Sequence, residues 1–155
     1  MITTILSDFS YVLLFPKAAD YKDTLNGLYR KIVQQEKYNF FDYYTLNEEL
    51  LKFYTELRDD GKSINIFTSG RVQDDPQLRG KLSVFENIIS AEDYGYSKAD
   101  KTTYEQITKV LGRNASEILF IDDQIINVNA AQEAGFTALL YKSNEALFNS
   151  IRALL

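Results

Sequence analysis

Residues 119–124, Leu119-Phe120-Ile121-Asp122-Asp123-Gln124, decide the fold of this chain. An apolar run that stops abruptly at charged residues is typical of a buried strand that ends at the edge of a sheet. The next stretch, 125–134, has a helical pattern and stops at Gly135, a residue that commonly terminates helices. A buried strand followed at once by a helix is the repeating unit of α/β proteins with parallel sheets.

The adjacent carboxylates Asp122 and Asp123 indicate a ligand site. Two like charges at one strand end disfavour each other's ionised form, so a cation normally lies between them. The carboxyl edge of a parallel sheet is where α/β proteins bind ligands, and a divalent metal with oxygen ligands is the simplest occupant. The alternative is a polar turn that happens to hold two aspartates, and this pair alone leaves both interpretations open.

The composition is that of one ordinary globular domain. The chain has 155 residues, of which 45% are hydrophobic and 25% charged. Its net charge of −5 argues against nucleic acid or an anionic membrane as the main partner. No stretch approaches the about 20 apolar residues of a membrane span, and the opening Met1-Ile2-Thr3-Thr4-Ile5-Leu6 lacks the features of a signal sequence. We therefore expect a soluble, cytoplasmic protein.

The absence of two residue types excludes several chemistries. Without Cys, the chain has no disulfide, no zinc–thiolate site and no thiol nucleophile. Without His, it has no Ser-His-Asp triad and no imidazole acid or base. Catalysis by this chain must use carboxylates, hydroxyls, Lys, Arg and a hard metal ion.

Strand-like and helix-like patterns alternate along the chain, as in a parallel α/β sheet. The predicted strands are 2–7, 63–68, 87–90, 118–121 and 137–141. The predicted helices are 20–36, one from Thr45 that ends before Gly61, one that opens at Asp75-Pro76, and 99–111, 125–134 and 144–154. Thr45 with Glu48 forms a capping-box signature, and Pro is favoured at the first position of a helix.

A polar group follows each of several predicted strands. In chain order they are a carboxylate, a hydroxyl, an ammonium group and a pair of carboxylates, and a right-handed parallel sheet brings them to one crevice. These residues are Asp8, Thr68 with Ser69 after it, Lys98, Asp122 and Asp123.

This order of groups resembles the haloacid dehalogenase-like (HAD) hydrolase superfamily. The resemblance covers almost the whole chain and is strongest in residues 97–101, 120–127 and 134–136. It implies a three-layer α/β/α fold with a doubly wound, Rossmann-like sheet of five parallel strands. The fourth and fifth strands would lie on one side of the first, and the second and third on the other. Residues 1–155 would form a single domain, with a short helical cap-like insertion at about 16–44 that carries substrate specificity.

The resemblance also implies an aspartyl-phosphate mechanism. Asp8 would attack phosphorus as the nucleophile, a recognised use of a carboxylate. Thr68, Ser69 and Lys98 would bind the phosphoryl oxygens of the substrate. Because charge stabilisation supplies most of the rate in phosphoryl transfer, the absence of His is no obstacle.

Mg²⁺ is the cofactor that the resemblance implies. Its ligands would be Asp8, the backbone carbonyl of Ser10, and Asp123, with Asp122 coordinating directly or through water. These are the oxygen ligands that Mg²⁺ prefers.

The first motif departs from the family pattern. Ser10 stands where phosphatases of the superfamily normally carry an Asp that acts as general acid and base, and Tyr11 stands where a Gly is usual. Ala99, in place of the usual Pro after the motif Lys, is a milder change. Loss of general acid–base help lowers turnover by about 10²–10⁴-fold.

We therefore expect a Mg²⁺-dependent phosphatase of low activity that acts on a small phosphorylated substrate or a phosphoprotein. One alternative is a catalytically degenerate HAD domain that binds a phosphorylated ligand or a protein partner. A second is a dehalogenase or phosphonatase-like hydrolase, although dehalogenases of the superfamily need no metal and the retained Asp122-Asp123 pair weighs against them.

The insertion contains an aromatic cluster, 38–44, with two interpretations. Its Tyr and Phe side chains either cover the site as a lid or pack the preceding helix onto the core, as buried aromatics commonly do.

Overall fold

The computed structural model describes residues 1–155 and contains a main sheet of five parallel strands in the order β5-β4-β1-β6-β7. The strands are β1 (Thr4–Ser7), β4 (Ser63–Thr68), β5 (Asn87–Ser90), β6 (Ile118–Asp122) and β7 (Thr137–Leu140). With the first strand in the centre and two strands on each side, this order is the one predicted.

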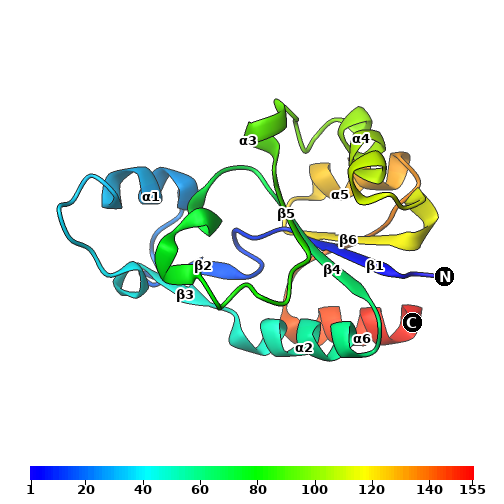
Figure 1. Ribbon diagram of the computed structural model, residues 1–155, viewed down its shortest axis with the longest axis horizontal. Coiled ribbons are helices and arrows are strands. Elements are labelled where there is room, and N and C mark those ends of the chain that lie inside the picture. The colour runs from blue at the N-terminus through cyan, green and yellow to red at the C-terminus, as the bar shows by residue number, and fades with distance from the viewer.

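Helices cover both faces of the main sheet (Figure 1), which is why the side chains of its central strands are buried and mostly apolar. On one face lie α2 (Glu48–Asp59) and α6 (Asn144–Leu154), and on the other α4 (Lys101–Leu111) and α5 (Ile125–Glu133). Alternate residues of a strand enter opposite cores: Ile5 packs into the larger hydrophobic cluster and Leu6 into the smaller one. The predicted α/β/α layers are therefore confirmed.

The register of the sheet aligns the strand ends that carry the polar groups. Ser7 of β1 pairs with Ile121 of β6 and with Ile66 of β4. The residue after Ser7, Asp8, donates its backbone N–H to the Ile121 carbonyl at 2.8 Å. The nucleophile candidate is thus fixed directly beside the carboxyl end of β6.

A second, two-stranded antiparallel sheet lies beside the carboxyl ends of the main strands and was not predicted. It pairs β2 (Leu14–Pro16) with β3 (Tyr44–Leu46), and Pro16 faces Tyr44. The intervening chain holds α1 (Leu25–Ile32) and a short 3₁₀ turn, η1 (Phe40–Asp42). Figure 1 shows this part projecting beyond the main sheet. The predicted insertion, 16–44, therefore begins and ends at the pairing of β2 with β3.

Two predicted helix starts in this region are wrong. The helix expected at 20–36 is only α1, because the Thr24 side chain caps it by accepting from the Gly27 N–H at 3.1 Å. Thr45 does not open a helix: it lies in β3, and Asn47 is the N-cap of α2, with its side chain accepting from the Leu50 N–H. Pairing of 44–46 with β2 overrides the capping-box signal at Thr45.

The helix predicted from Asp75-Pro76 is also wrong, since this stretch forms two 3₁₀ turns, η2 (Val72–Asp74) and η3 (Pro76–Leu78). Asp75 does act as a cap, for the Gln77 N–H at 2.8 Å. Its other carboxylate oxygen accepts from the hydroxyls of Tyr29 and Tyr38, which ties the insertion to this segment. A one-turn helix, α3 (Ala91–Tyr94), and a 3₁₀ turn, η4 (Ala115–Glu117), complete the fold and were not predicted.

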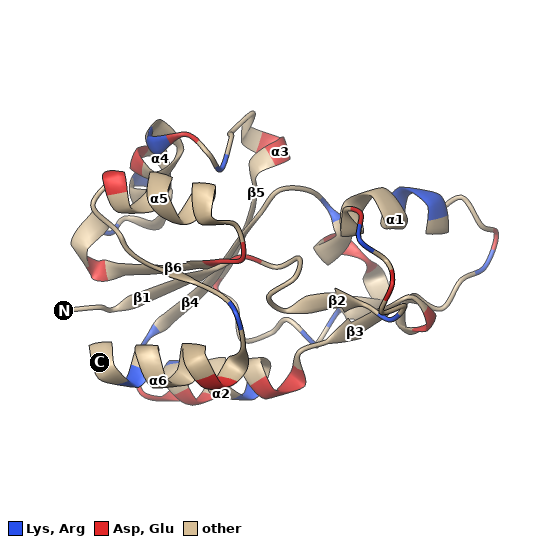
Figure 2. Cartoon of the chain, turned by 180° about the vertical axis from the view of Figure 1, so that it is seen from behind, with Lys and Arg blue, Asp and Glu red and all other residues tan.

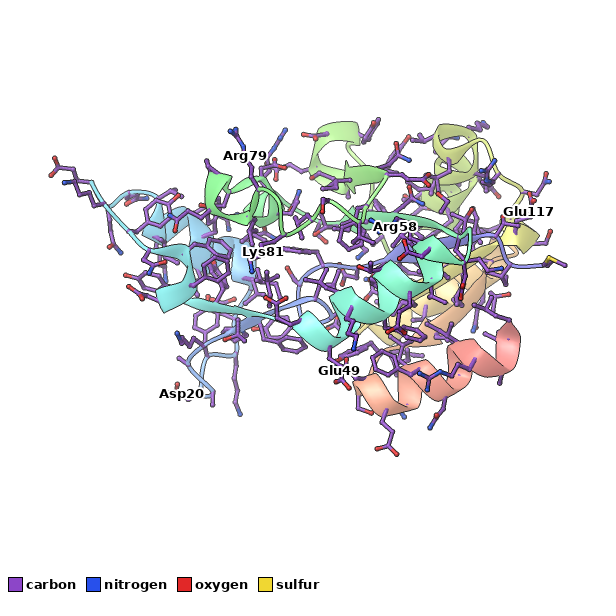
Figure 3. The ribbon with its side chains drawn as sticks, turned by 60° about the horizontal axis from the view of Figure 1, so that its bottom comes forward. Asp20, Glu49, Arg58, Arg79, Lys81 and Glu117 are labelled. Carbon is purple, nitrogen blue, oxygen red and sulfur yellow. The ribbon has the colours of Figure 1, made fainter.

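Charged side chains lie mostly on the outside of these layers. In Figure 3 the labelled residues Asp20, Glu49 and Arg79 project from the surface of the molecule. No helix of the fold has the length and apolar character that a membrane span requires.

Candidate active site

Asp8 lies at the centre of the site, immediately beyond β1, with its side chain buried. Its Oδ1 accepts from the backbone N–H of Phe9 at 2.7 Å, and its carbonyl accepts from the Ser7 hydroxyl at 2.9 Å. Ser7 in turn receives the Tyr54 hydroxyl of α2 at 2.8 Å. Hydrogen bonds therefore hold both the carboxylate and the backbone carbonyl of Asp8 in place.

Lys98 brings a buried positive charge to this carboxylate. Its Nζ lies 2.9 Å from Asp8 Oδ1 and 2.6 Å from Asp122 Oδ2. The backbone that carries Lys98 precedes α4 and is fixed by the Tyr104 hydroxyl, which donates to the Lys98 carbonyl at 2.6 Å. One ammonium group thus links the ends of β1 and β6.

The two aspartates after β6 have different surroundings. Asp122 is fully buried, and its Oδ1 accepts from the Gln124 N–H at 2.8 Å and from the Asn127 side chain at 3.2 Å. Asp123 is only partly buried and faces the cavity. Figure 2 shows acidic residues at the carboxyl end of β6, on the side toward α1.

Two buried hydroxyls at the site have no hydrogen-bond partner within the protein. They are Ser10 Oγ, in the loop after Asp8, and Thr68 Oγ1, at the end of β4. Most buried polar groups are satisfied, so each exception calls for an explanation. Both residues line the same cavity as Asp8, so a bound anion or its water would supply the missing partners.

Burial raises the pKa of Asp8 to about 8, because Asp122 and Asp123 add to the cost of its charge while Lys98 only partly offsets it. Burial also raises the pKa of Asp123. Burial lowers the pKa of Lys98, but Asp8 and Asp122 outweigh this effect and leave it above its ordinary value. The site therefore holds more negative charge than Lys98 alone neutralises.

This charge balance suits a divalent cation. One carboxylate oxygen from each of Asp8, Asp122 and Asp123 lies within 4.8 Å of the others. Oxygen ligands around such a point are those that Mg²⁺ and Ca²⁺ use. Because Asp122 already receives Lys98, Gln124 and Asn127, the carboxylates with free coordinating capacity are those of Asp8 and Asp123.

All these groups except Asp122 open into one cavity of about 370 Å³. The predicted residues Asp8, Ser10, Thr68, Ser69, Lys98 and Asp123 line it, whereas Asp122 lies behind Asp123 and does not. The aromatic cluster 38–44 does not line it either: Phe40 and Tyr44 are buried and stacked 4.5 Å apart, so the packing interpretation is correct.

The remaining lining comes from residues that were not predicted as site residues. They are Tyr11, Gln124, Asn127 and the consecutive residues Lys22, Asp23, Thr24, Leu25 and Asn26. Tyr11 has a φ of +61°, the left-handed conformation that favours glycine, at the position where the family usually has one. That mismatch was the sequence signal for Tyr11, while residues 22–26 reach the site only through the fold of the insertion.

Comparisons with known proteins agree with the chemistry of these groups. The chain is 30% identical over 102 residues to the sesquiterpene phosphatase astK of Aspergillus oryzae. The matched region covers 64% of this chain and 52% of that protein. The chain is also 30% identical over 99 residues to enolase-phosphatase E1 of Naegleria gruberi, covering 60% of this chain and 39% of that one. The chain thus spans about half, or less, of the length of the curated relatives it matches.

Solved structures share the fold over nearly the whole chain. A HAD-like family hydrolase of Porphyromonas gingivalis superimposes with a TM-score of 0.71 at 19% identity, covering 99% of this chain and 98% of that one. A HAD family enzyme of Bacteroides thetaiotaomicron, in complex with magnesium and inorganic phosphate, gives 0.67 at 15% identity, covering 93% and 96%.

The model of the haloacid dehalogenase-like hydrolase family matches residues 12–135, which is most of the sequence. The match spans Thr68, Lys98 and Asp123, which line the cavity, and Asp122 beside them, and the fold agrees with it. The chain therefore belongs to the haloacid dehalogenase-like hydrolase family.

Proposed function

We propose that this protein is a Mg²⁺-dependent phosphatase that hydrolyses phosphate monoesters through an aspartyl-phosphate on Asp8. The observation that carries the proposal is the pairing of the buried Asp8 carboxylate with Lys98 at 2.9 Å in a cavity that also holds two unpartnered hydroxyls. Phosphatases among its relatives and the crystallised magnesium–phosphate complex of a protein with this fold support it.

Asp8 would supply the nucleophile. Its carboxylate oxygen forms a bond to phosphorus as the bond to the leaving oxygen breaks, and water then hydrolyses the acyl phosphate to release inorganic phosphate. The Phe9 N–H and Lys98 hold the attacking group in place before the reaction, so little reorganisation is needed.

Thr68 and Lys98 would bind the transferring group. The Thr68 hydroxyl is free to donate to a phosphoryl oxygen, and the Lys98 ammonium stabilises the negative charge that develops there. Asp8, Asp123 and the Ser10 carbonyl would hold Mg²⁺, with Asp122 acting directly or through water. When bound, the ion neutralises the carboxylates and the phosphate, which Lys98 alone does not do.

Ser10 limits the rate in this proposal. A serine hydroxyl does not exchange protons with the leaving group as readily as a carboxyl group does, so the leaving oxygen takes its proton from water. The expected penalty is about 10²–10⁴-fold relative to a site with an acid at this position.

Ser10 also favours the second candidate, a degenerate domain that binds a phosphorylated ligand without turning it over. The two candidates share Thr68, Lys98 and the carboxylates but differ in whether the phosphate ester is cleaved. The partly open cavity of about 370 Å³ suits a small phosphorylated molecule better than a folded phosphoprotein. The dehalogenase or phosphonatase-like alternative and the cytoplasmic location stay predictions from the sequence.

Turnover of 4-nitrophenyl phosphate with and without Mg²⁺ tests the proposal. We expect slow, Mg²⁺-dependent release of phosphate that Asp8→Asn abolishes, since an amide cannot form the acyl phosphate. Asp59→Asn, an exposed aspartate at the end of α2, is the matched control and should leave the rate unchanged. Activity that survives Asp8→Asn contradicts the mechanism, and binding of phosphate without turnover favours the second candidate.

A further inference from the structure

The insertion contributes a roof to the cavity, which we define as residues 22–26. It lies over the groups that would hold the phosphate, and its exposed side chains are polar: Lys22, Asp23 and Thr24. The apolar member, Leu25, is buried and directs its side chain into the larger hydrophobic cluster. The part of the cavity left for the organic half of a substrate is therefore polar.

Lys22 and Asp23 bring opposite charges to this roof, and neither takes part in a salt bridge. Asp23 Oδ1 accepts from the Thr24 N–H at 2.7 Å, while the Lys22 ammonium makes no hydrogen bond within the protein. Such groups are able to hydrogen-bond hydroxyl or charged groups of a ligand, whereas an apolar ligand gains no such bond.

Hydrogen bonds from three directions hold the roof in place. The Tyr11 hydroxyl donates to the Asp23 carbonyl at 2.6 Å, and the Tyr21 hydroxyl donates to the Thr24 carbonyl at 2.9 Å. The buried Tyr44 hydroxyl donates to the Leu25 carbonyl at 2.8 Å. The positions of the polar groups are thus fixed before a ligand arrives.

Asn26 joins the roof to the loop after β4. Its Oδ1 accepts the backbone N–H groups of Arg71 and Val72 at 2.9 and 3.0 Å. Its side chain lies against Gly70 so closely that a Cβ there would come within 2.4 Å of it. Because Thr68 and Ser69 precede Gly70, the roof and the phosphate-binding hydroxyls are held by one contact and keep a fixed separation.

The size of the cavity adds a second restriction. A volume of about 370 Å³ is near the lower end of the range for ligand pockets, about 300–1,000 Å³. The phosphate group and a metal ion occupy part of it. The part of the organic group that lies under the roof is therefore short, and a longer group would extend into solvent because the cavity is partly open.

From these observations we infer that the roof selects phosphate esters whose organic part is small and polar, with Lys22 contacting a hydroxyl or anionic group of the substrate. This inference rests on the proposed phosphatase activity and names its substrate class. Long apolar esters are disfavoured because they make no hydrogen bonds with the roof and their chains would extend into solvent without being buried.

Specificity constants measured with Mg²⁺ test the inference. The polar probes are glycerol 3-phosphate, ribose 5-phosphate and phosphoserine, the apolar probe is farnesyl monophosphate, and 4-nitrophenyl phosphate is the reference. For the best polar ester we expect kcat/KM to exceed that for farnesyl monophosphate by at least about 10-fold. Lys22→Leu should reduce this ratio by about 5-fold or more, because a charge-assisted hydrogen bond is lost.

Lys37→Leu is the matched control, since Lys37 is an exposed lysine of the same insertion that does not line the cavity. It should leave the ratio unchanged. A wild-type ratio below 10, a ratio that Lys22→Leu does not alter, or an equal effect of Lys37→Leu would overturn the inference. If Asp8-dependent turnover of 4-nitrophenyl phosphate is seen in those cases, the proposed function is still supported. If no such turnover is seen, both the proposed function and the inference are contradicted.

Discussion

Lys98 has the most demanding environment of any single residue in this protein. Its ammonium group is buried between the carboxylates of Asp8 and Asp122 and lies 5.3 Å from the centre of the Phe67 ring. A buried charge is tolerated only where partners of opposite charge compensate for the lost water. The carboxylates need Lys98 for the same reason, so the three residues depend on one another for stability as well as for chemistry.

Removing this ammonium group should destabilise the fold. Lys98→Met keeps the length of the side chain but leaves Asp8 and Asp122 buried without a cation, and we expect a loss of about 3–5 kcal/mol in the free energy of unfolding. Denaturant unfolding without metal measures the change. Lys52→Met, at an exposed position of α2, is the control and should change the free energy of unfolding little. A loss below about 1 kcal/mol for Lys98→Met would contradict the dependence of the buried carboxylates on Lys98.

The raised pKa of Asp8 predicts how stability depends on pH. Its pKa is about 8 in the folded protein against 3.8 for an ordinary aspartate, so the folded state binds more protons between these values. The contribution of this proton binding to the free energy of unfolding is complete below pH 4 and is lost as the pH rises toward 8. In metal-free buffer the free energy of unfolding should therefore fall from pH 5 to pH 8. Asp8→Asn should flatten this dependence, and an equally steep fall in the variant would contradict the prediction.

Ser10 offers a test for a gain of function. Ser10→Asp places a carboxyl group beside the nucleophile and should raise turnover of 4-nitrophenyl phosphate by about 10-fold, less than the full 10²–10⁴-fold of acid–base catalysis. The gain is limited because Tyr11 holds the loop in a left-handed conformation through its bond to the Asp23 carbonyl. Ser10→Asn, of similar size but without a titratable group, is the control and should give no increase. A rate unchanged by Ser10→Asp would mean that this position has no part in the reaction.

Among the elements, the start of α2 shows how tertiary structure overrides a local signal. The Thr45–Glu48 capping pattern predicted a helix start two residues early, because the pairing of β3 with β2 is a contact between distant segments. The cap is Asn47, whose side chain accepts from the Leu50 N–H and donates to the Val12 carbonyl at 3.0 Å. It thereby attaches α2 to the loop that follows Asp8.

Substitutions distinguish the two caps. Asn47→Ala should lower the free energy of unfolding by about 1–2 kcal/mol, since it removes the cap and leaves the Val12 carbonyl without this donor. Thr45→Ala should change it by less than about 0.5 kcal/mol, because Thr45 is exposed on β3. Thermal or denaturant unfolding compares the two, and a larger loss for Thr45→Ala would restore the predicted helix start.

The strands of the main sheet were predictable and the insertion was not. The segments 63–68 and 87–90 are strands over the predicted residues, because short runs rich in β-branched residues favour strands. Residues 20–36 have a helical pattern but form only the eight residues of α1. The chain beyond Ile32 instead places Tyr38 on Asp75, a contact that no local pattern contains.

At the scale of the whole molecule, the topology explains why part of the site could be predicted. Asp8 follows β1, and Thr68 and Asp122 end the neighbouring strands β4 and β6, so the order of the motifs was enough to bring them together. Residues 22–26 line the same cavity because of how the insertion folds, and no periodic pattern in the sequence predicts that position. The grouping of these side chains at one edge of the sheet was therefore predictable, and the contribution of residues 22–26 to the cavity was not.

A crystal structure grown with Mg²⁺ and beryllium fluoride, a mimic of the phosphoryl group, would show whether Asp8 is the nucleophile and shares a metal ion with Asp123. We expect beryllium fluoride bound to the Asp8 carboxylate. The Thr68 hydroxyl and Lys98 should donate hydrogen bonds to its fluorine atoms, and Asp8 and Asp123 should share one Mg²⁺. Asp8→Asn crystals grown in the same solution should show neither group at these positions. Wild-type crystals in which Asp8 carries no fluoride and shares no metal with Asp123 would contradict the claim.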